Sequence, residues 1–171
     1  KNQLVKEINT TPTSSMGRLF DVVSSLLGLR QSITYEAQAA IELEALADPI
    51  EMVYYPWQIV DNEINIGSLI SAILTDIENN IEKAVIAARF HNTIAQISLS
   101  IAQKIQQDLG IDRFVLSGGV WQNQLLLEKT TALLLKNSIQ PLIHSQTPPN
   151  DGCVAFGQAL ITAYRYLRDK E

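Results

Sequence analysis

Two adjacent glycines that separate an apolar run from a helical pattern constrain the fold of this chain most strongly. Residues 114–116 have the composition of a buried strand, Gly118 and Gly119 follow shortly after, and residues 121–136 have helical periodicity. A second apolar run follows at residues 141–144. A strand, a helix and a second strand in this order are typical of a βαβ unit with parallel strands. The sequence therefore predicts an α/β fold around a small parallel sheet.

Most of the remaining chain is predicted to be helical, so the expected α/β fold is helix-dominated. Apolar residues recur with helical spacing in five further stretches, at residues 16–27, 33–47, 67–77, 81–109 and 154–168. Gly28 is expected to end the first of these helices, because glycine is common just after a helix C-terminus. Residues 50–66 are β-branched and aromatic with turn residues between them, which predicts either short strands or a packed loop.

The composition excludes several classes of protein. The chain has 171 residues, of which 46% are hydrophobic, and its formal net charge is −5. A domain of this size buries a substantial core, whereas no apolar run reaches the roughly 18 residues that a membrane helix needs. Lys and Arg do not cluster as they do in nucleic-acid binders. The single cysteine, Cys153, excludes an internal disulfide and favours a cytoplasmic protein.

Ser117, Gly118 and Gly119 lie where the first predicted strand ends. In open α/β sheets, ligands bind beyond the carboxyl ends of the strands. Glycines there let the backbone approach a ligand closely, and the N–H groups that open the next helix favour an anion such as a phosphate. The alternative is that a tight strand-to-helix turn requires glycine without any ligand. The stretch lacks the Gly-Lys-Ser/Thr of a P-loop and the third glycine of a Rossmann fingerprint, so neither motif applies.

A second candidate site is the turn PPNDGCVAFGQA at residues 148–159, which precedes the last predicted helix. Asp151 lies at or next to the N-terminus of that helix. One interpretation is an aspartate N-cap, which stabilises a helix by about 1 kcal/mol. The other is a carboxylate at the end of a strand that binds a metal ion or a hydroxyl group.

A third candidate is the stretch TSSMGRLFD at residues 13–21. Gly17 interrupts an early helical turn, where glycine costs about 1 kcal/mol relative to alanine. Asp21 follows four residues later on the same helical face. A glycine beside a carboxylate leaves a shallow site for a ribose or a base, although a first helical turn also tolerates glycine without any function.

These stretches together resemble a known family. TSSMGRLFD, ITYEAQAAIELEALA, IAARFHNTIA, FVLSGGVWQNQLLLE and PPNDGCVAFGQA are similar, in this order, to the C-terminal part of the HypF carbamoyltransferases, which mature [NiFe]-hydrogenases. The resemblance covers nearly the whole chain and is weakest over residues 50–80. It implies part of a lobe of the sugar kinase/Hsp70/actin-like ATPase fold. Residues 1–80 would be mainly a helical insertion, and residues 81–171 an α-β-α-β-α nucleotide-binding lobe.

The resemblance also implies a reaction. A carbamoyl group would pass from carbamoyl-adenylate, made from carbamoyl phosphate and ATP, to the C-terminal cysteine of a HypE-type protein. Two alternatives remain open, a transferase similar to those that make threonylcarbamoyl-adenosine in tRNA, and a nucleotide-binding lobe that docks other proteins without catalysis. The acceptor thiol belongs to the partner, so no catalytic residue is assigned in this chain.

The site residues follow from the same resemblance. The turn from Ser117 through Gly118 and Gly119 would contact the phosphate, and Asn123 would lie near the same group. Gly17 and Asp21 would hold the adenosine side. Asp151 would bind a divalent metal ion, zinc or iron, in the full-length protein.

The sequence departs from the family pattern in ways that predict an incomplete site. The family's metal site uses a His-x-x-x-His pair, whereas His91 and His144 are far apart in this sequence. We expect His91 to be buried and hydrogen-bonded, and His144 to lie at the surface. Because the chain begins with Lys1 rather than Met, we expect a fragment or a processed product. Because the histidine pair and the first half of the duplicated ATPase architecture are missing, we expect this fragment to be inactive alone. Its partners would be other domains of the full-length chain and a HypE-type protein, with no nucleic acid or membrane, and the fragment is expected to be prone to self-association.

Overall fold

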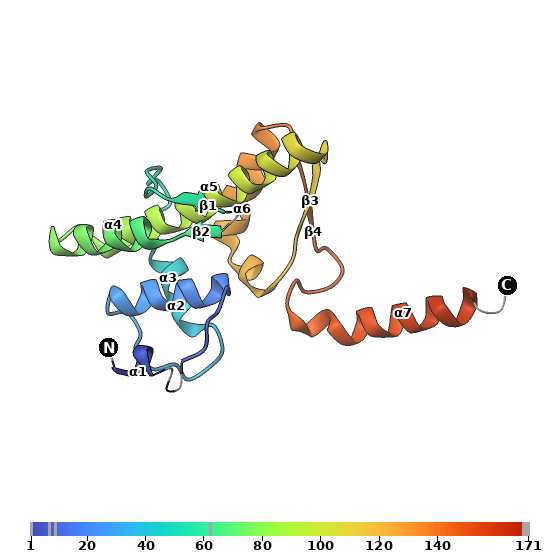
Figure 1. Cartoon of the computed structure of the whole chain (residues 1–171), viewed down its shortest axis with the longest axis horizontal. Helices are drawn as coiled ribbons and strands as arrows, with labels where there is room; N and C mark the ends of the chain where they lie inside the picture. The colour runs from blue at the N-terminus through green and yellow to red at the C-terminus, as the bar shows by residue number, and fades with distance from the viewer. Residues whose placement is uncertain (1, 7, 9, 62, 169–171) are drawn as a thin grey trace.

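The computed structural model describes residues 2–6, 8, 10–61 and 63–168. Figure 1 shows the order and arrangement of the helices and strands. The elements are α1 (Asn2–Val5), α2 (Met16–Leu26), α3 (Gln38–Leu46), β1 (Gln58–Val60), β2 (Glu63–Asn65), α4 (Gly67–Glu78), α5 (Lys83–Leu109), β3 (Arg113–Leu116), the 3-10 helix η1 (Gly119–Gln122), α6 (Gln124–Lys136), β4 (Gln140–Ile143), the 3-10 helix η2 (Asp151–Cys153) and α7 (Val154–Arg168). The prediction of a helix-dominated α/β fold is confirmed.

The long helix α5 is the central element of the core. It contacts α3, α4 and α6, and α2 packs on α3 beside it. Phe20 of α2 and Phe90 of α5 meet edge to face, with ring centroids 4.8 Å apart, and both side chains are buried. Such pairs stabilise a core by roughly 1 kcal/mol beyond the area that they bury. Residues before and after position 80 therefore share one hydrophobic core.

Two helix boundaries differ from the prediction for local reasons. The helix expected from residue 33 begins at Gln38, because Ala37 has φ +62° and a left-handed residue cannot continue a right-handed helix. The helix expected from residue 121 begins at Gln124, because η1 intervenes and the Asn123 side chain caps α6. Gly28, at φ +64°, follows the end of α2 as expected.

The predicted βαβ unit is confirmed. Strands β3 and β4 pair in parallel, with Leu116 opposite Ile143, and α6 connects them. Part of residues 50–66 forms the antiparallel hairpin β1–β2, and the residues before it run over α5 without regular structure. Both interpretations of that region were therefore partly correct.

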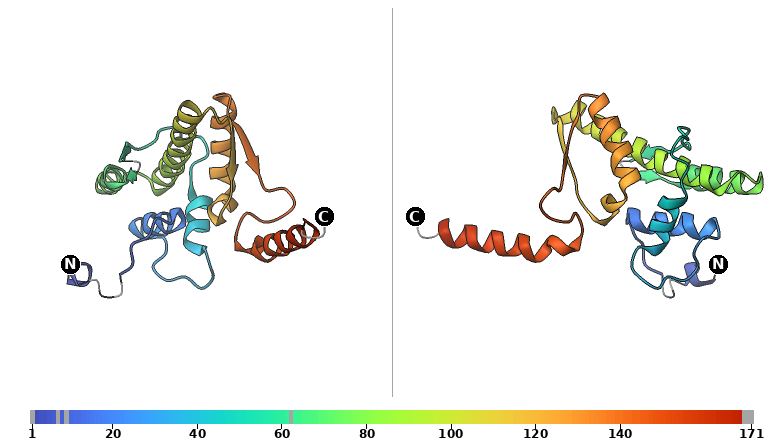
Figure 2. Two further views of the ribbon diagram at one scale, coloured as in Figure 1. Left: turned by 45° about the vertical axis from the view of Figure 1, so that its right-hand side comes forward. Right: turned by 180° about the vertical axis from the view of Figure 1, so that it is seen from behind.

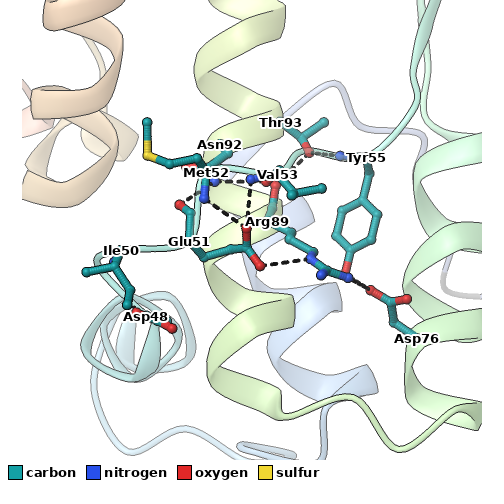
Figure 3. Close-up of polar contacts among 10 residues, drawn as sticks. All are labelled: Asp48, Ile50, Glu51, Met52, Val53, Tyr55, Asp76, Arg89, Asn92 and Thr93. Carbon is teal, nitrogen blue, oxygen red and sulfur yellow. Dashed lines mark hydrogen bonds and ion pairs between the residues drawn. The ribbon is translucent and has the colours of Figure 1, made fainter.

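Hydrogen bonds to α5 hold the extended segment before β1 in place (Figure 3). The side-chain amide of Asn92 donates to the carbonyl oxygens of Glu51 and Val53 at 2.9 and 2.8 Å. The N–H of Tyr55 donates to Thr93 Oγ1 at 2.8 Å. These bonds satisfy backbone groups that have no partner within a sheet, so the segment remains ordered without forming a strand.

An ion-pair network centred on Arg89 joins the same segment to α4 and α5. Its guanidinium donates to Glu51 Oε2 at 3.2 Å and to Asp76 Oδ2 at 2.9 Å. The hydroxyl of Tyr55 donates to Asp76 at 2.8 Å, and burial raises the pKa of this phenol. Hydrogen bonding to the backbone of Val53 and the pairing with Arg89 hold the pKa of the Glu51 carboxyl below its usual value. The network is a structural tether between three elements.

The C-terminal part of the fold leaves apolar surface uncovered. Helix α7 extends away from the other helices in all views and buries none of its described side chains (Figure 2). Apolar residues on α7 and on the two parallel strands are exposed, namely Val115, Leu142, Ile143, Val154, Phe156, Leu160, Ile161, Tyr164 and Leu167. Parallel sheets in proteins are ordinarily covered on both faces. This apolar surface is therefore typical of one that other protein segments cover.

Candidate functional site

The turn after β3 needs glycine at one of its two glycine positions. Gly118 has φ +113° and ψ 157°, a backbone conformation that is almost exclusive to glycine. Its N–H donates to the carbonyl oxygen of Pro149 at 2.8 Å, and its carbonyl oxygen accepts from the N–H of Trp121 at 3.1 Å. The backbone of the turn therefore explains Gly118 without any ligand, and its N–H is already occupied by the chain.

Gly119 has no such explanation. Its φ lies outside the left-handed region, and a Cβ added there would lie 3.8 Å from the Cβ of Asn150, an ordinary van der Waals distance. Alanine would therefore fit into the described part of the chain at this position. Glycine is the usual residue where the backbone approaches a ligand closely, so the position is consistent with a ligand outside the chain.

Asn123 closes the turn and starts α6. Its Oδ1 accepts from the N–H of Leu126 at 2.8 Å, and its Nδ2 lies 2.9 Å from His91 Nε2. The side chain is only 8% exposed. The expectation that Asn123 lies near the phosphate stays a prediction, but both ends of its amide are engaged within the chain. The geometry gives it the role of a support for the turn.

His91 is the buried partner of Asn123. It is fully buried, and its Nδ1 lies 2.7 Å from the carbonyl oxygen of Ala87, which can only accept. Nδ1 therefore carries the proton and Nε2 accepts from the Asn123 amide. Burial, with a smaller contribution from the positive charge of Lys129, lowers the pKa of His91 to about 4. The prediction of a buried, hydrogen-bonded histidine is confirmed.

The segment that carries Asp151 lies against the glycine turn. Besides the bond from Gly118 to Pro149, the Asn150 Nδ2 donates to Gln122 Oε1 at 3.3 Å. The side chain that caps η2 is that of Asn150, whose Oδ1 accepts from Gly152 at 3.1 Å. Asp151 is therefore not the cap of η2, because the preceding residue makes that bond, but it does lie next to the start of the last helix as expected. Asp151 itself is exposed beside the turn.

Gly17 and Asp21 lie on α2, which contacts η1. The views in Figures 1 and 2 agree in placing the turn before α6 between α2 and the start of α7. A Cβ on Gly17 would meet only Ser15 Oγ at 3.7 Å, so packing does not require this glycine either. Asp21 is 38% exposed and pairs with Arg18 at 3.8 Å, a loose surface ion pair. The three predicted places thus lie around one region of the molecule.

The described residues do not by themselves fit a metal site. Among them, no three His, Cys, Asp or Glu side chains gather closely enough to hold an ion. His91 is buried and hydrogen-bonded on both nitrogens, and His144 bonds to neighbouring hydroxyl groups. Asp151 is the one predicted ligand that this chain offers, so a metal ion would need further ligands from elsewhere. In the part of the chain that the structure describes, no helix is both long and apolar enough to cross a membrane.

Comparisons with known proteins decide the family. The family model described as "Carbamoyltransferase, Kae1-like Domain, second subdomain" matches residues 1–158. The chain belongs to the HypF carbamoyltransferase family. A carbamoyltransferase HypF of Synechocystis sp. is 41% identical over 162 residues, which are 91% of this chain and 20% of that protein. The resemblance inferred from the sequence is therefore confirmed.

Solved HypF structures share the fold. A full-length HypF in a phosphate- and nucleotide-bound form matches with a TM-score of 0.89 and 37% identity, over 94% of this chain and 22% of that one. HypF of T. kodakarensis matches with a TM-score of 0.83 and 26% identity, over 98% and 22% of the two chains. This chain thus spans about one fifth of the length of these HypF proteins.

An open cavity lies away from the glycine turn and is not assigned to the candidate site. It has a volume of about 1000 Å³ and lies between the start of α2, the β1–β2 hairpin and the second half of α5. It is lined mainly by apolar side chains such as Ile64, Ile97 and Ile101, and by none of the predicted site residues. We place the candidate site at the glycine turn because the unexplained Gly119 and the exposed Ser117 lie there, and because α2, which carries the unexplained Gly17, contacts this turn.

Proposed function

We propose that this chain supplies one wall of the adenylate site of a HypF-type carbamoyltransferase. In the proposed reaction, carbamoyl-adenylate made from carbamoyl phosphate and ATP donates its carbamoyl group to the C-terminal cysteine of a HypE-type protein. Membership of the HypF family supports the reaction class. The relative solved in a phosphate- and nucleotide-bound form supports a nucleotide as ligand. The α5-β3-α6-β4-α7 order supports one lobe of a sugar kinase/Hsp70/actin-like ATPase fold, with residues 1–80 added to it.

One observation carries the proposal. Gly17 and Gly119 lie on elements that contact each other, α2 and η1, and the described part of the chain gives neither position a reason to be glycine. Glycine in a helix is less stable than alanine by about 0.5–1 kcal/mol. A ligand whose phosphate approaches Gly119 and whose adenosine approaches Gly17 explains both positions at once.

In the proposed reaction, the residues of this chain bind and orient the carbamoyl-adenylate. In a mixed carbamoyl–phosphate anhydride, attack of a thiolate sulfur on the carbonyl carbon forms the C–S bond. The bond from that carbon to the phosphate oxygen breaks, and AMP leaves with the electron pair. The turn residues hold the departing phosphate, which favours its release because donors that face developing negative charge stabilise it. The acceptor protein brings the thiol, whose proton passes to solvent. A zinc or iron ion is proposed for the whole protein, with Asp151 as one ligand.

The test is the substitution Gly119→Ala in the full-length protein. We expect AMP affinity, measured by calorimetry, to fall at least tenfold, a change of about 1.4 kcal/mol. Thermal unfolding should occur at an unchanged or higher temperature, because alanine fits at this position and restricts the unfolded chain. Asp21→Ala should also weaken AMP binding. Ser71→Ala on the exposed face of α4 is the control and should leave affinity unchanged. Unchanged AMP affinity in both site variants would remove the assignment.

We further propose that the rest of the full-length chain covers the apolar face of α7 and of the β3–β4 sheet. This chain spans only about one fifth of its relatives, so ample protein remains to cover these residues. The isolated chain exposes the same face and is therefore expected to self-associate.

Light scattering after size-exclusion chromatography checks this expectation. The isolated chain should show a mass that rises with concentration. The double substitution Leu160→Lys with Tyr164→Lys should raise the concentration needed for association at least tenfold, because charges replace exposed apolar side chains. Leu74→Lys changes an exposed apolar residue on α4 and should have little effect. A monomeric wild-type chain at all concentrations would contradict the expectation.

A further inference from the structure

A hydrogen-bonded chain of side chains joins the two parallel strands at the proposed phosphate site. Ser117 and His144 follow the registered pair Leu116 and Ile143 at the carboxyl ends of β3 and β4. His144 Nε2 lies 2.9 Å from Ser117 Oγ, and His144 Nδ1 lies 3.2 Å from Thr147 Oγ1. The imidazole ring is therefore held through both nitrogens, and its orientation is set by its two neighbours.

The position of this chain connects it to the turn. Ser117 is exposed and directly precedes Gly118, whereas its hydrogen-bond partner His144 is half-buried. His144 also lines a cavity of about 320 Å³ together with Leu116, Gln122 and Pro149, which belong to or adjoin the turn. The carboxyl ends of parallel strands are where α/β sheets bind ligands. A phosphate held by the turn would therefore lie within reach of the Ser117 hydroxyl.

The direction of the hydrogen bond between Ser117 and His144 determines whether the Ser117 hydroxyl can donate a hydrogen bond to a ligand. A hydroxyl group has one hydrogen to donate, and either nitrogen of a neutral imidazole can be the protonated one. When Nε2 carries the hydrogen, it donates to Ser117 Oγ and leaves the Ser117 O–H free to point outward. With the other tautomer, Ser117 donates to His144 and presents only lone pairs. Phosphoryl oxygens only accept, so they are complementary to the first arrangement.

We propose that His144 is a positioning residue that orients the Ser117 hydroxyl as a hydrogen-bond donor to the phosphate of the bound adenylate. The proposal rests on the function proposed above. In this arrangement the Thr147 hydroxyl is the donor to Nδ1, so both ring nitrogens have partners while the hydrogen of the ring lies on Nε2. His144 acts through Ser117, so its contribution depends on the presence of that hydroxyl.

The experiment is a double-mutant cycle in the full-length protein, with AMP and adenosine as the two probes. We expect His144→Ala and Ser117→Ala each to weaken AMP binding about fivefold, which corresponds to one hydrogen bond of about 1 kcal/mol. The double variant should bind AMP no more weakly than Ser117→Ala alone. Adenosine affinity should stay within twofold in all variants, because adenosine lacks the phosphate.

A conservative variant separates orientation from simple cross-strand support. The amide nitrogen of glutamine always donates, so His144→Gln should restore AMP affinity to within twofold of the wild type. If His144→Ala weakens AMP binding equally with and without Ser117, the proposal is overturned. If His144→Ala lowers the melting temperature but leaves AMP affinity unchanged, the proposal is also overturned, and His144 only stabilises the pairing of the two strands. If Gly119→Ala still weakens AMP binding in those cases, the adenylate site stands and only the role of His144 fails.

Discussion

Acidification from pH 7 to pH 4 is expected to lower the free energy of unfolding of this chain by about 3 kcal/mol through His91. The pKa of His91 is lowered to about 4 in the folded chain, against about 6.5 for an unperturbed histidine. The unfolded chain therefore takes up a proton on His91 between these values while the folded chain does not. The contribution is fully present above pH 6.5 and is lost as the pH falls through 4, by about 1.4 kcal/mol per pH unit.

The geometry around His91 explains why the folded state resists this proton. Nε2 accepts a hydrogen bond from Asn123, so a hydrogen on Nε2 would face the amide hydrogen of Asn123. Turning the amide to present its oxygen would break the bond from Leu126, which caps α6. Protonation of His91 would thus place a buried charge beside an unsatisfied donor and would also release the support of the glycine turn.

Urea unfolding of the wild type and of His91→Gln at pH 7, 6, 5 and 4 measures this effect. Glutamine keeps a donor and an acceptor but does not titrate, so the variant isolates His91 from carboxyl groups that titrate at low pH. Between pH 7 and pH 4, the free energy of unfolding of the wild type should fall by about 3 kcal/mol relative to that of His91→Gln. Parallel pH profiles for the two proteins would contradict the assignment of a neutral, buried His91.

The second large effect is expected for Arg89→Met, which should lower the free energy of unfolding by about 3 kcal/mol. Arg89 is the cation for two carboxylates, and the side chains of Glu51 and Asp76 are only 15% and 18% exposed. Removing one partner of a largely buried ion pair leaves a charge without compensation, which costs about 3–5 kcal/mol in fully buried sites. Methionine keeps most of the apolar stem, so the loss reports on the guanidinium rather than on packing.

A surface ion pair on α5 provides the matched control. Lys104 pairs with Asp108 at 3.0 Å, and both side chains are more than half exposed. Lys104→Met should change stability by no more than about 0.5 kcal/mol. Hydrogen exchange should show faster exchange at Tyr55 in Arg89→Met but not in Lys104→Met, because the Arg89 network holds that segment. Equal stability losses in the two variants would refute the tethering role of Arg89.

Local patterns predicted the regular elements well where the physical cause is local. The apolar runs of β3 and β4 and the helical period of α5 each depend on residues near one another in sequence. Gly28 was recognisable at the end of α2 because a left-handed residue there has a steric reason. Ala37 also has positive φ, but an alanine in this conformation cannot be recognised from the sequence. The start of α3 was therefore predicted several residues too early.

The candidate site was predicted less completely. The sequence singled out Gly17, Gly119 and Asp151, and the structure places their elements around one region. It could not show that Gly118 is explained by the backbone alone, or that Asn150 rather than Asp151 caps η2. Asparagine and aspartate both cap helices, so the choice between neighbours depends on the exact path of the turn.

The sequence by itself determined the family, the βαβ unit and the position of the glycine turn, because these depend on residue types at short spacing. Only the tertiary structure decided which side chains meet. His91 and Asn123 are 32 residues apart, and Ser117 and His144 are 27 apart. Such pairs arise from the packing of α5 against α6 and from the register of β3 with β4, which have no local signature. The His91–Asn123 and Ser117–His144 pairs, which support the turn, could therefore be identified only from the tertiary structure.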